Sequence, residues 1–121
     1  IIWAGLKLTS TEVTITDAAQ AFFRYENGVN DGELQAISSV GGVDVATDTG
    51  IVIAVSTQYR FKIAIGSDRK AKFYVNGKHY KTSAALTTAV DLIPYIGVAC
   101  DGTGAAKAIS VYGQAISRVM A

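Results

Sequence analysis

The range 58–82 constrains the fold more than any other part of the chain. Apolar and polar residues alternate over 59–65, and the alternation returns over 70–76. A period of two is typical of a strand that is buried on one face. Gly66-Ser67-Asp68-Arg69 separates the two runs. Asn76-Gly77 follows the second run, and both of its residues accept the positive φ of a type I′ hairpin turn. The range therefore predicts a three-stranded antiparallel meander.

Strand patterns continue along the rest of the chain. We expect further strands over 1–8, 20–26, 33–39, 51–55, 90–100 and 106–119, the last one bent near Gly113. The range 43–50 is polar and is predicted to be a loop. The range 90–100 is apolar on both faces, which predicts a central strand covered on both sides, although Pro94 inside it argues for an edge or a bulge. Turns about every ten residues are typical of a sandwich or barrel.

We therefore predict an all-β fold, a two-sheet antiparallel β-sandwich. The residues expected between the two sheets are Phe61, Ile63, Ile65, Phe73, Val75, Ile96, Val98, Ile109 and Val111. A chain of 121 residues, half of them hydrophobic, is enough for one core, so residues 1–121 are expected to form a single domain. Because the chain opens inside an apolar run, we expect this domain to be the C-terminal part of a longer chain.

The composition excludes some partners. The formal net charge is only +1, so no overall field attracts the chain to nucleic acid. No apolar run reaches the roughly 18 to 20 residues of a membrane span. Neither nucleic acid nor a membrane is therefore an expected partner.

Candidate catalytic and metal-binding groups are sparse. No predicted strand carries two acids at the spacing that a glycosidase acid and base would need. His79 and Cys100, the single histidine and cysteine, are too distant in sequence to suggest a zinc site or a Cys–His pair. Asp44, Asp48 and Asp101 lie in predicted loops and could bind calcium, but their spacing matches no calcium-loop motif. We predict a non-enzymatic protein without a cofactor, and calcium is the one metal left open.

Several motifs resemble known domains. Phe73-Tyr74-Val75-Asn76-Gly77-Lys78 is similar to the central hairpin of concanavalin-A-like and laminin-G-like jelly-roll domains, and the ranges 92–98 and 108–112 resemble their closing strands. Four further motifs together resemble domains of bacteriophage virion proteins: Gly5–Leu8, Phe22–Glu26, Asp91–Pro94 and Ala115–Arg118. The resemblance implies a jelly-roll domain of a virion structural protein, used as a capsid decoration, head-fibre or tail-appendage subunit.

Carbohydrate binding is the alternative function. Lectin-like domains bind sugars with exposed aromatic rings beside polar loop groups. The aromatic candidates are Trp3, Tyr74, Tyr80 and Tyr112. In this alternative the chain is a lectin-like module for host or glycan recognition. The simpler explanation is that these rings are covered by the other sheet or by a neighbouring subunit.

Two surfaces are predicted to contact other proteins. Arg60, Lys62, Lys70 and Lys72 alternate with apolar residues, so they share the face away from the core. A solvated outer face explains them most simply, and docking onto an acidic partner is the functional hypothesis.

The second surface is apolar. The mean hydropathy is positive, and a two-layer sandwich covers only one face of each sheet. We therefore expect a homo-oligomer or contacts with other virion proteins. The candidate interface residues are Tyr74, Tyr112, Val119 and Met120, because aromatic residues and Met are enriched at interfaces.

Overall fold

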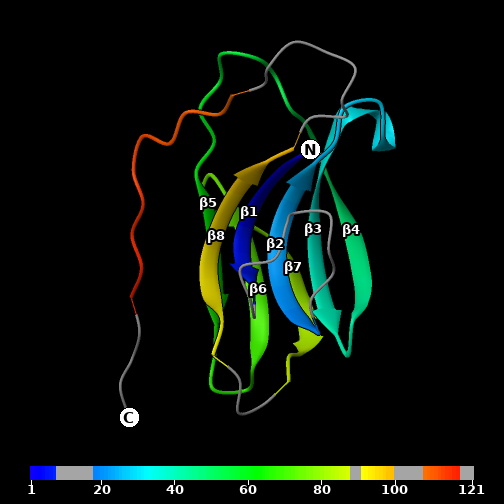
Figure 1. Cartoon of the computed structure of the whole chain (residues 1–121), viewed down its shortest axis with the longest axis vertical. Coiled ribbons are helices and arrows are strands. Elements are labelled where there is room, and N and C mark those ends of the chain that lie inside the picture. The colour runs from blue at the N-terminus through cyan, green and yellow to red at the C-terminus, as the bar shows by residue number, and fades with distance from the viewer. Residues whose placement is uncertain (8–17, 88–90, 100–107, 118–121) are drawn as a thin grey trace.

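A computed structural model describes residues 1–7, 18–87, 91–99 and 108–117 (Figure 1). The regular elements within these ranges are β1 (Ile2–Lys7), β2 (Ala19–Tyr25), the 3-10 helix η1 (Asn30–Gly32), β3 (Glu33–Val40), β4 (Val43–Val52), β5 (Phe61–Ile65), β6 (Lys70–Val75), β7 (Lys78–Ala85) and β8 (Ile93–Val98). The prediction of an all-β fold is confirmed. In the described part of the chain, no helix has the length and apolar character needed to cross a membrane.

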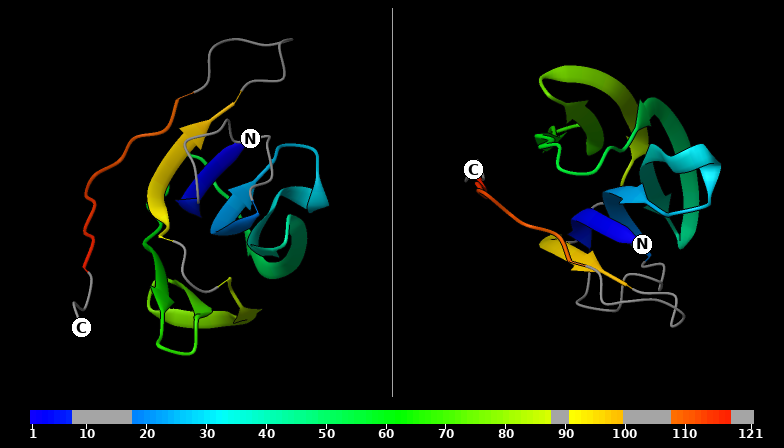
Figure 2. Two further views of the ribbon diagram at one scale, coloured as in Figure 1. Left: turned by 60° about the horizontal axis from the view of Figure 1, so that its bottom comes forward. Right: turned by 90° about the horizontal axis from the view of Figure 1, so that it is seen from above.

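The strands form two antiparallel sheets that lie as separate layers (Figure 2). Sheet A has the strand order β4-β3-β2-β1-β8, and sheet B has the order β5-β6-β7. Across the layers, β7 contacts β3 and β5 contacts β2. Sheet B therefore has fewer strands than sheet A and lies against one of its faces (Figure 1).

Two tight hairpins fix the register of neighbouring strands. Asn76 and Gly77 have φ angles of 51° and 84°, and they join Val75 to Lys78, which pair across β6 and β7. Gly41 and Gly42 have φ angles of 61° and 78° and connect β3 to β4 in the same way. Positive φ at both central residues gives a turn whose twist matches that of the strands. The predicted meander is confirmed, because β5, β6 and β7 pair in sequence order.

The prediction of a loop over 43–50 is wrong, because these residues belong to β4. β4 is the edge strand of sheet A, and most of its side chains are exposed. Because most of these side chains are exposed, the strand does not require an apolar sequence. The strand signal lies in β-branched residues that alternate with others, as in Val43-Asp44-Val45-Ala46-Thr47.

The core lies between sheet B and the strands β2 and β3 of sheet A. The Phe23 ring stacks on Phe61, with centroids 4.8 Å apart, and meets Phe73 edge-on at 5.4 Å. The buried core residues are Ala21, Phe23, Leu34, Ala36, Ala71, Phe73, Val75 and Leu86. Among the predicted core residues, Phe73 and Val75 are fully buried, whereas Phe61, Ile63 and Ile65 are half-buried against the cluster.

The core predictions at the C-terminal end are wrong. Ile96, Val98 and Val111 are 40%, 38% and 54% exposed, and Ile109 is half-buried. β8 is an edge strand rather than a central one, which suits Pro94 because proline lacks the N–H that a ladder needs. Sheet B contacts β2 and β3 most closely, and it leaves the side chains of Ile96 and Val98 on β8 incompletely covered. The described residues 108–117 of the predicted closing strand belong to no strand.

Replacing Phe73 with alanine tests the core. Phe73→Ala should lower the free energy of unfolding by roughly 3 to 5 kcal/mol, the usual cost of removing a buried ring. Urea denaturation followed by circular dichroism measures this change. Val55→Ala is the control, because Val55 is 93% exposed and should change stability by no more than about 0.5 kcal/mol. A loss below about 1 kcal/mol for Phe73→Ala would contradict this core.

Candidate functional site

Four cations share the outer face of sheet B. Arg60, Lys62, Lys70 and Lys72 are exposed, and each alternates with a residue that points into the core. The Arg60 backbone N–H donates to Asn76 Oδ1 at 2.9 Å, which ties the start of β5 to the β6–β7 turn. Among the described residues, no carboxylate forms an ion pair with any of the four. This basic face is therefore available to a negatively charged partner.

Polar and aromatic groups cross the basic face from strand to strand. Lys62 is opposite Tyr74 in the β5–β6 ladder, and its Nζ lies 5.3 Å from the centroid of the Tyr74 ring. Tyr74 is half-buried and lies 5.3 Å from the His79 ring. His79 Nε2 is hydrogen bonded to Thr82 Oγ1 at 2.9 Å. The face thus combines positive charge with a partly exposed tyrosine ring, a residue type that is enriched in protein interfaces.

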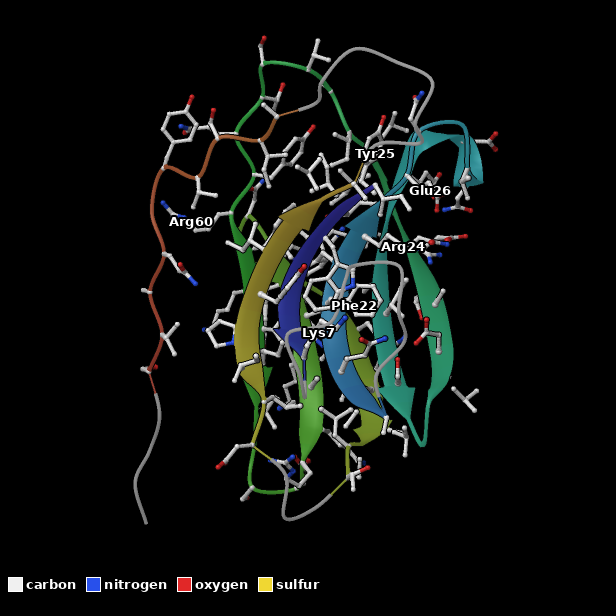
Figure 3. The ribbon with its side chains drawn as sticks, viewed as in Figure 1. Lys7, Phe22, Arg24, Tyr25, Glu26 and Arg60 are labelled. Carbon is white, nitrogen blue, oxygen red and sulfur yellow. The ribbon has the colours of Figure 1, made fainter. Side chains whose placement is uncertain are left out.

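The outer face of sheet A holds a buried aromatic cluster. Trp3 is only 1% exposed, stacks on Phe22 at 4.4 Å and meets Tyr95 edge-on at 5.2 Å. Lys7 Nζ lies 5.5 Å from the Trp3 centroid and 5.4 Å from that of Tyr95, within range of a cation–π interaction. Figure 3 shows Lys7 and Phe22 on this face. Trp3 cannot serve as an exposed sugar-binding platform, so that expectation is wrong.

A row of polar side chains crosses the same sheet near its other end. Arg24 Nη2 donates to Gln35 Oε1 at 2.8 Å, and Gln35 Nε2 donates to Asp48 Oδ1 at 2.9 Å. Asn30 Nδ2 donates to the same Asp48 oxygen at 2.8 Å. The four side chains form one hydrogen-bonded chain from β2 to β4, which orients the Asp48 carboxylate.

The proposed calcium ligands are not arranged as a calcium loop. Asp44 and Asp48 lie on the strand β4 and not in a loop, and Asp101 is outside the described residues. Asp44 Oδ1 accepts hydrogen bonds from Gln20 Nε2 at 3.2 Å and from Ser39 Oγ. Both carboxylates thus face hydrogen-bond donors. In the described ranges, no group of three or more His, Cys, Asp or Glu side chains could hold a metal ion.

An open groove of about 350 Å³ lies between the β3–β4 edge and β7. Its lining residues are Ser38, Val40, Val43, Val45, Lys81, Thr82, Ser83 and Ala84. Lys81 Nζ crosses between the sheets and donates to the carbonyl oxygens of Val45 at 2.7 Å and Ala36 at 3.3 Å. Burial removes water from the ammonium group and lowers the pKa of Lys81 from 10.5.

Sequence reasoning missed this inward position of Lys81. The alternation of the meander groups Lys81 with the outer-face cations, but a register shift between β6 and β7 places Lys81 opposite Phe73. Such an irregularity moves a side chain to the other face of a strand. The residues next to Lys81 in the sequence do not indicate this register shift between β6 and β7.

The predicted interface residues come from separate elements. Tyr74 lies on β6, in the basic face, whereas Tyr112 is 80% exposed on the segment 108–117. Val119 and Met120 lie outside the described residues. No ring contact joins Tyr74 to Tyr112 in the part of the chain that the structure describes. Tyr74 and Tyr112 thus lie on separate elements, and the interface formed by the four residues stays a prediction.

No family model matches this chain, and neither does any curated protein or solved structure with which it was compared. The surfaces of the chain itself are therefore the guide to its function.

The pH dependence of stability tests the Lys81 contacts. Because the folded-state pKa lies below that of the unfolded chain, the unfolded state binds more protons in the window between the two values. The contribution of Lys81 to stability should therefore rise as pH increases through that window. Comparing Lys81→Met with the wild type at about pH 7 and about pH 10 isolates this effect, because other groups titrate in both proteins. A stability difference that is constant with pH would contradict it.

Proposed function

We propose that this chain is a non-enzymatic structural subunit of a bacteriophage virion that acts through protein–protein contacts. A capsid decoration, head-fibre or tail-appendage subunit fits this role. The observation that carries the proposal is the apolar surface left open beside the core, where Ile96 and Val98 are 40% and 38% exposed. Contiguous apolar surface next to a core favours a protein partner. The virion setting is supported by the resemblance of four sequence motifs to virion domains.

In this proposal the two facing sheets are a concanavalin-A-like jelly roll. The support is the pair of antiparallel sheets and the type I′ hairpin at Asn76-Gly77, in the motif that resembles the central hairpin of such domains. The sheets provide two distinct contact surfaces. The basic face lies on the outer side of sheet B. The second surface, here called the apolar opening, is formed by the exposed side chains of Ile96 and Val98 on β8.

The two surfaces suit different partners. The exposed cations of the basic face favour an acidic virion neighbour, because opposite charges speed encounter and orient docking. The apolar opening favours tighter and more permanent contacts. We therefore assign docking onto the particle to the basic face and self-association to the apolar opening.

Charge reversal on the basic face tests the docking surface. Lys62→Glu combined with Lys72→Glu should weaken binding to particles of the source phage roughly tenfold, because an exposed ion pair contributes about 0.2 to 1 kcal/mol and reversal adds repulsion. Binding of the wild type should also fall as salt rises. Lys78→Glu is the matched control, because Lys78 Nζ lies 5.1 Å from the Tyr80 ring, and Tyr80 packs against the core side of sheet B. Binding that is insensitive to salt and to the double reversal would contradict this surface.

Electron microscopy of the source phage tests the virion role. Antibodies against this chain, detected with gold, should label intact particles at regular positions on the head, the fibres or the tail. Particles from a phage lacking the gene are the control. Absence of label on wild-type particles, with the chain present only free in the lysate, would contradict a structural role.

Glycan recognition is the second candidate function. The observation that favours it is the Tyr74 ring, which is half-buried and is flanked by Lys62 and His79 as potential hydrogen-bond partners of a sugar. A glycan array distinguishes the two functions. Specific binding that disappears in Tyr74→Ala would support the lectin-like module, and an array without signal would leave the structural role.

A further inference from the structure

β5 is the outermost strand of sheet B on the side where β8 ends sheet A (Figures 1 and 2). It packs on β2, where the Phe61 and Phe23 rings stack. The inward-facing side chains of β1 and β8 are nevertheless incompletely covered: Ile2, Ala4 and Leu6 are half-buried, and Ile96 and Val98 are more exposed still. The apolar interior is therefore incompletely closed on this side, and a further strand along the outer edge of β5 would close it.

The outer edge of β5 has no strand partner among the described elements. Among the described strands β5 pairs with β6 alone, so no described strand pairs with the N–H and C=O groups of its other edge. The side chains of β5 that point inward, Phe61, Ile63 and Ile65, are only half-buried. An unpaired edge beside an incompletely covered apolar surface is a template for strand addition.

The segment 108–117 has the pattern of the missing strand. Ile109, Val111, Gly113 and Ala115 fall on one face, and Ser110, Tyr112 and Gln114 fall on the other. Every residue in this segment except Ile109 is exposed, Val111 by 54% and Ile116 by 65%. The segment runs apart from the body of the molecule on the side of β5 and β8 (Figures 1 and 2). A segment with the alternation of a strand is thus exposed on the side of the molecule where β5 has no described partner.

We propose that the segment 108–117 pairs with the free edge of β5 in a second copy of this chain, and that two copies exchange their segments reciprocally. The direction of the chain favours a second copy over the same chain. The segment runs from the end where β8 finishes toward the opposite end, as β5 does (Figure 1). Within one molecule it would lie parallel to β5, in a sheet whose other pairs are antiparallel. A twofold axis across the strands reverses the partner's segment and makes the pairing antiparallel.

The exchange would give the edge of β5 a ladder partner and would also cover the exposed apolar side chains of β8. The donated strand pairs with the backbone of β5, and its apolar face, with Ile109 and Val111, covers Ile96 and Val98 of sheet A. This inference rests on the self-association part of the proposed function and does not need the virion role.

Paired variants test the exchange. By light scattering, the wild type should have twice the chain mass of 12.7 kDa. Val111→Asp disables the donated strand and Val98→Asp disables the acceptor surface, so each should weaken dimerisation at least about a hundredfold, because each buries an unpaired charge. Mixing the two variants should restore a dimer, because the intact segment of the Val98→Asp copy can enter the intact acceptor of the Val111→Asp copy.

Two further measurements keep the result independent of misfolding. Ser110→Asp is the matched control: it changes the other neighbour of Val111, which is exposed on the opposite face of the same segment, and it should leave the dimer intact. In the wild type, hydrogen exchange at residues 61–65 should be slower in the dimer than in the monomer obtained by dilution. Circular dichroism of each variant checks that the body stays folded.

Three results would overturn the exchange. A monomer with protected amides over 108–117 would show that the segment docks on its own chain. A monomer without such protection would show that no second copy binds there, and a virion neighbour would then be the remaining partner. A dimer that survives both aspartate variants would use another surface. None of these results would remove gold label from the phage particle, so failure of the exchange is distinguishable from failure of the virion role.

Discussion

Phe23 joins the two sheets of this protein. It lies on β2, the central strand of sheet A, and its ring contacts both Phe61 and Phe73 of sheet B. Aromatic pairs in stacked and edge-on geometry add about 0.5 to 1.5 kcal/mol each beyond the burial of their area. This contact therefore holds β5 and β6 of sheet B against β2.

The register of β2 is fixed from both sides. Phe23 points into the core, while its neighbour Phe22 points to the outer face and stacks on Trp3. Gly5 makes this close approach of β1 and β2 possible, because a Cβ at that position would lie 2.6 Å from Phe22 Cβ. A slip of one residue would exchange the two rings between faces and break both clusters. Sheet A is thus buried on both faces around β2.

The two sheets expose different surfaces that are available for function. Sheet B has one buried face and one face with exposed cations around Tyr74, which suits a reversible, salt-sensitive contact. The inner face of sheet A is incompletely covered at β8, where apolar residues are exposed, and this suits a contact made through backbone pairing and burial. Unpaired edges beside exposed apolar residues promote uncontrolled aggregation unless a specific partner covers them. A strand supplied by a second copy would give this edge a defined partner.

The sequence by itself determined the meander over 58–82. Its turns depend on local chemistry, since Asn76 and Gly77 accept positive φ, and its alternation assigns Phe73 and Val75 to the core and Lys62 and Lys72 to the opposite face. It did not determine which strands lie opposite one another. Only the tertiary structure decided that Ile96 and Val98 are exposed, that Trp3 is buried and that a register shift turns Lys81 inward. The physical reason is that burial of a strand face depends on the other sheet, and the width and position of that sheet follow from contacts between residues distant in sequence.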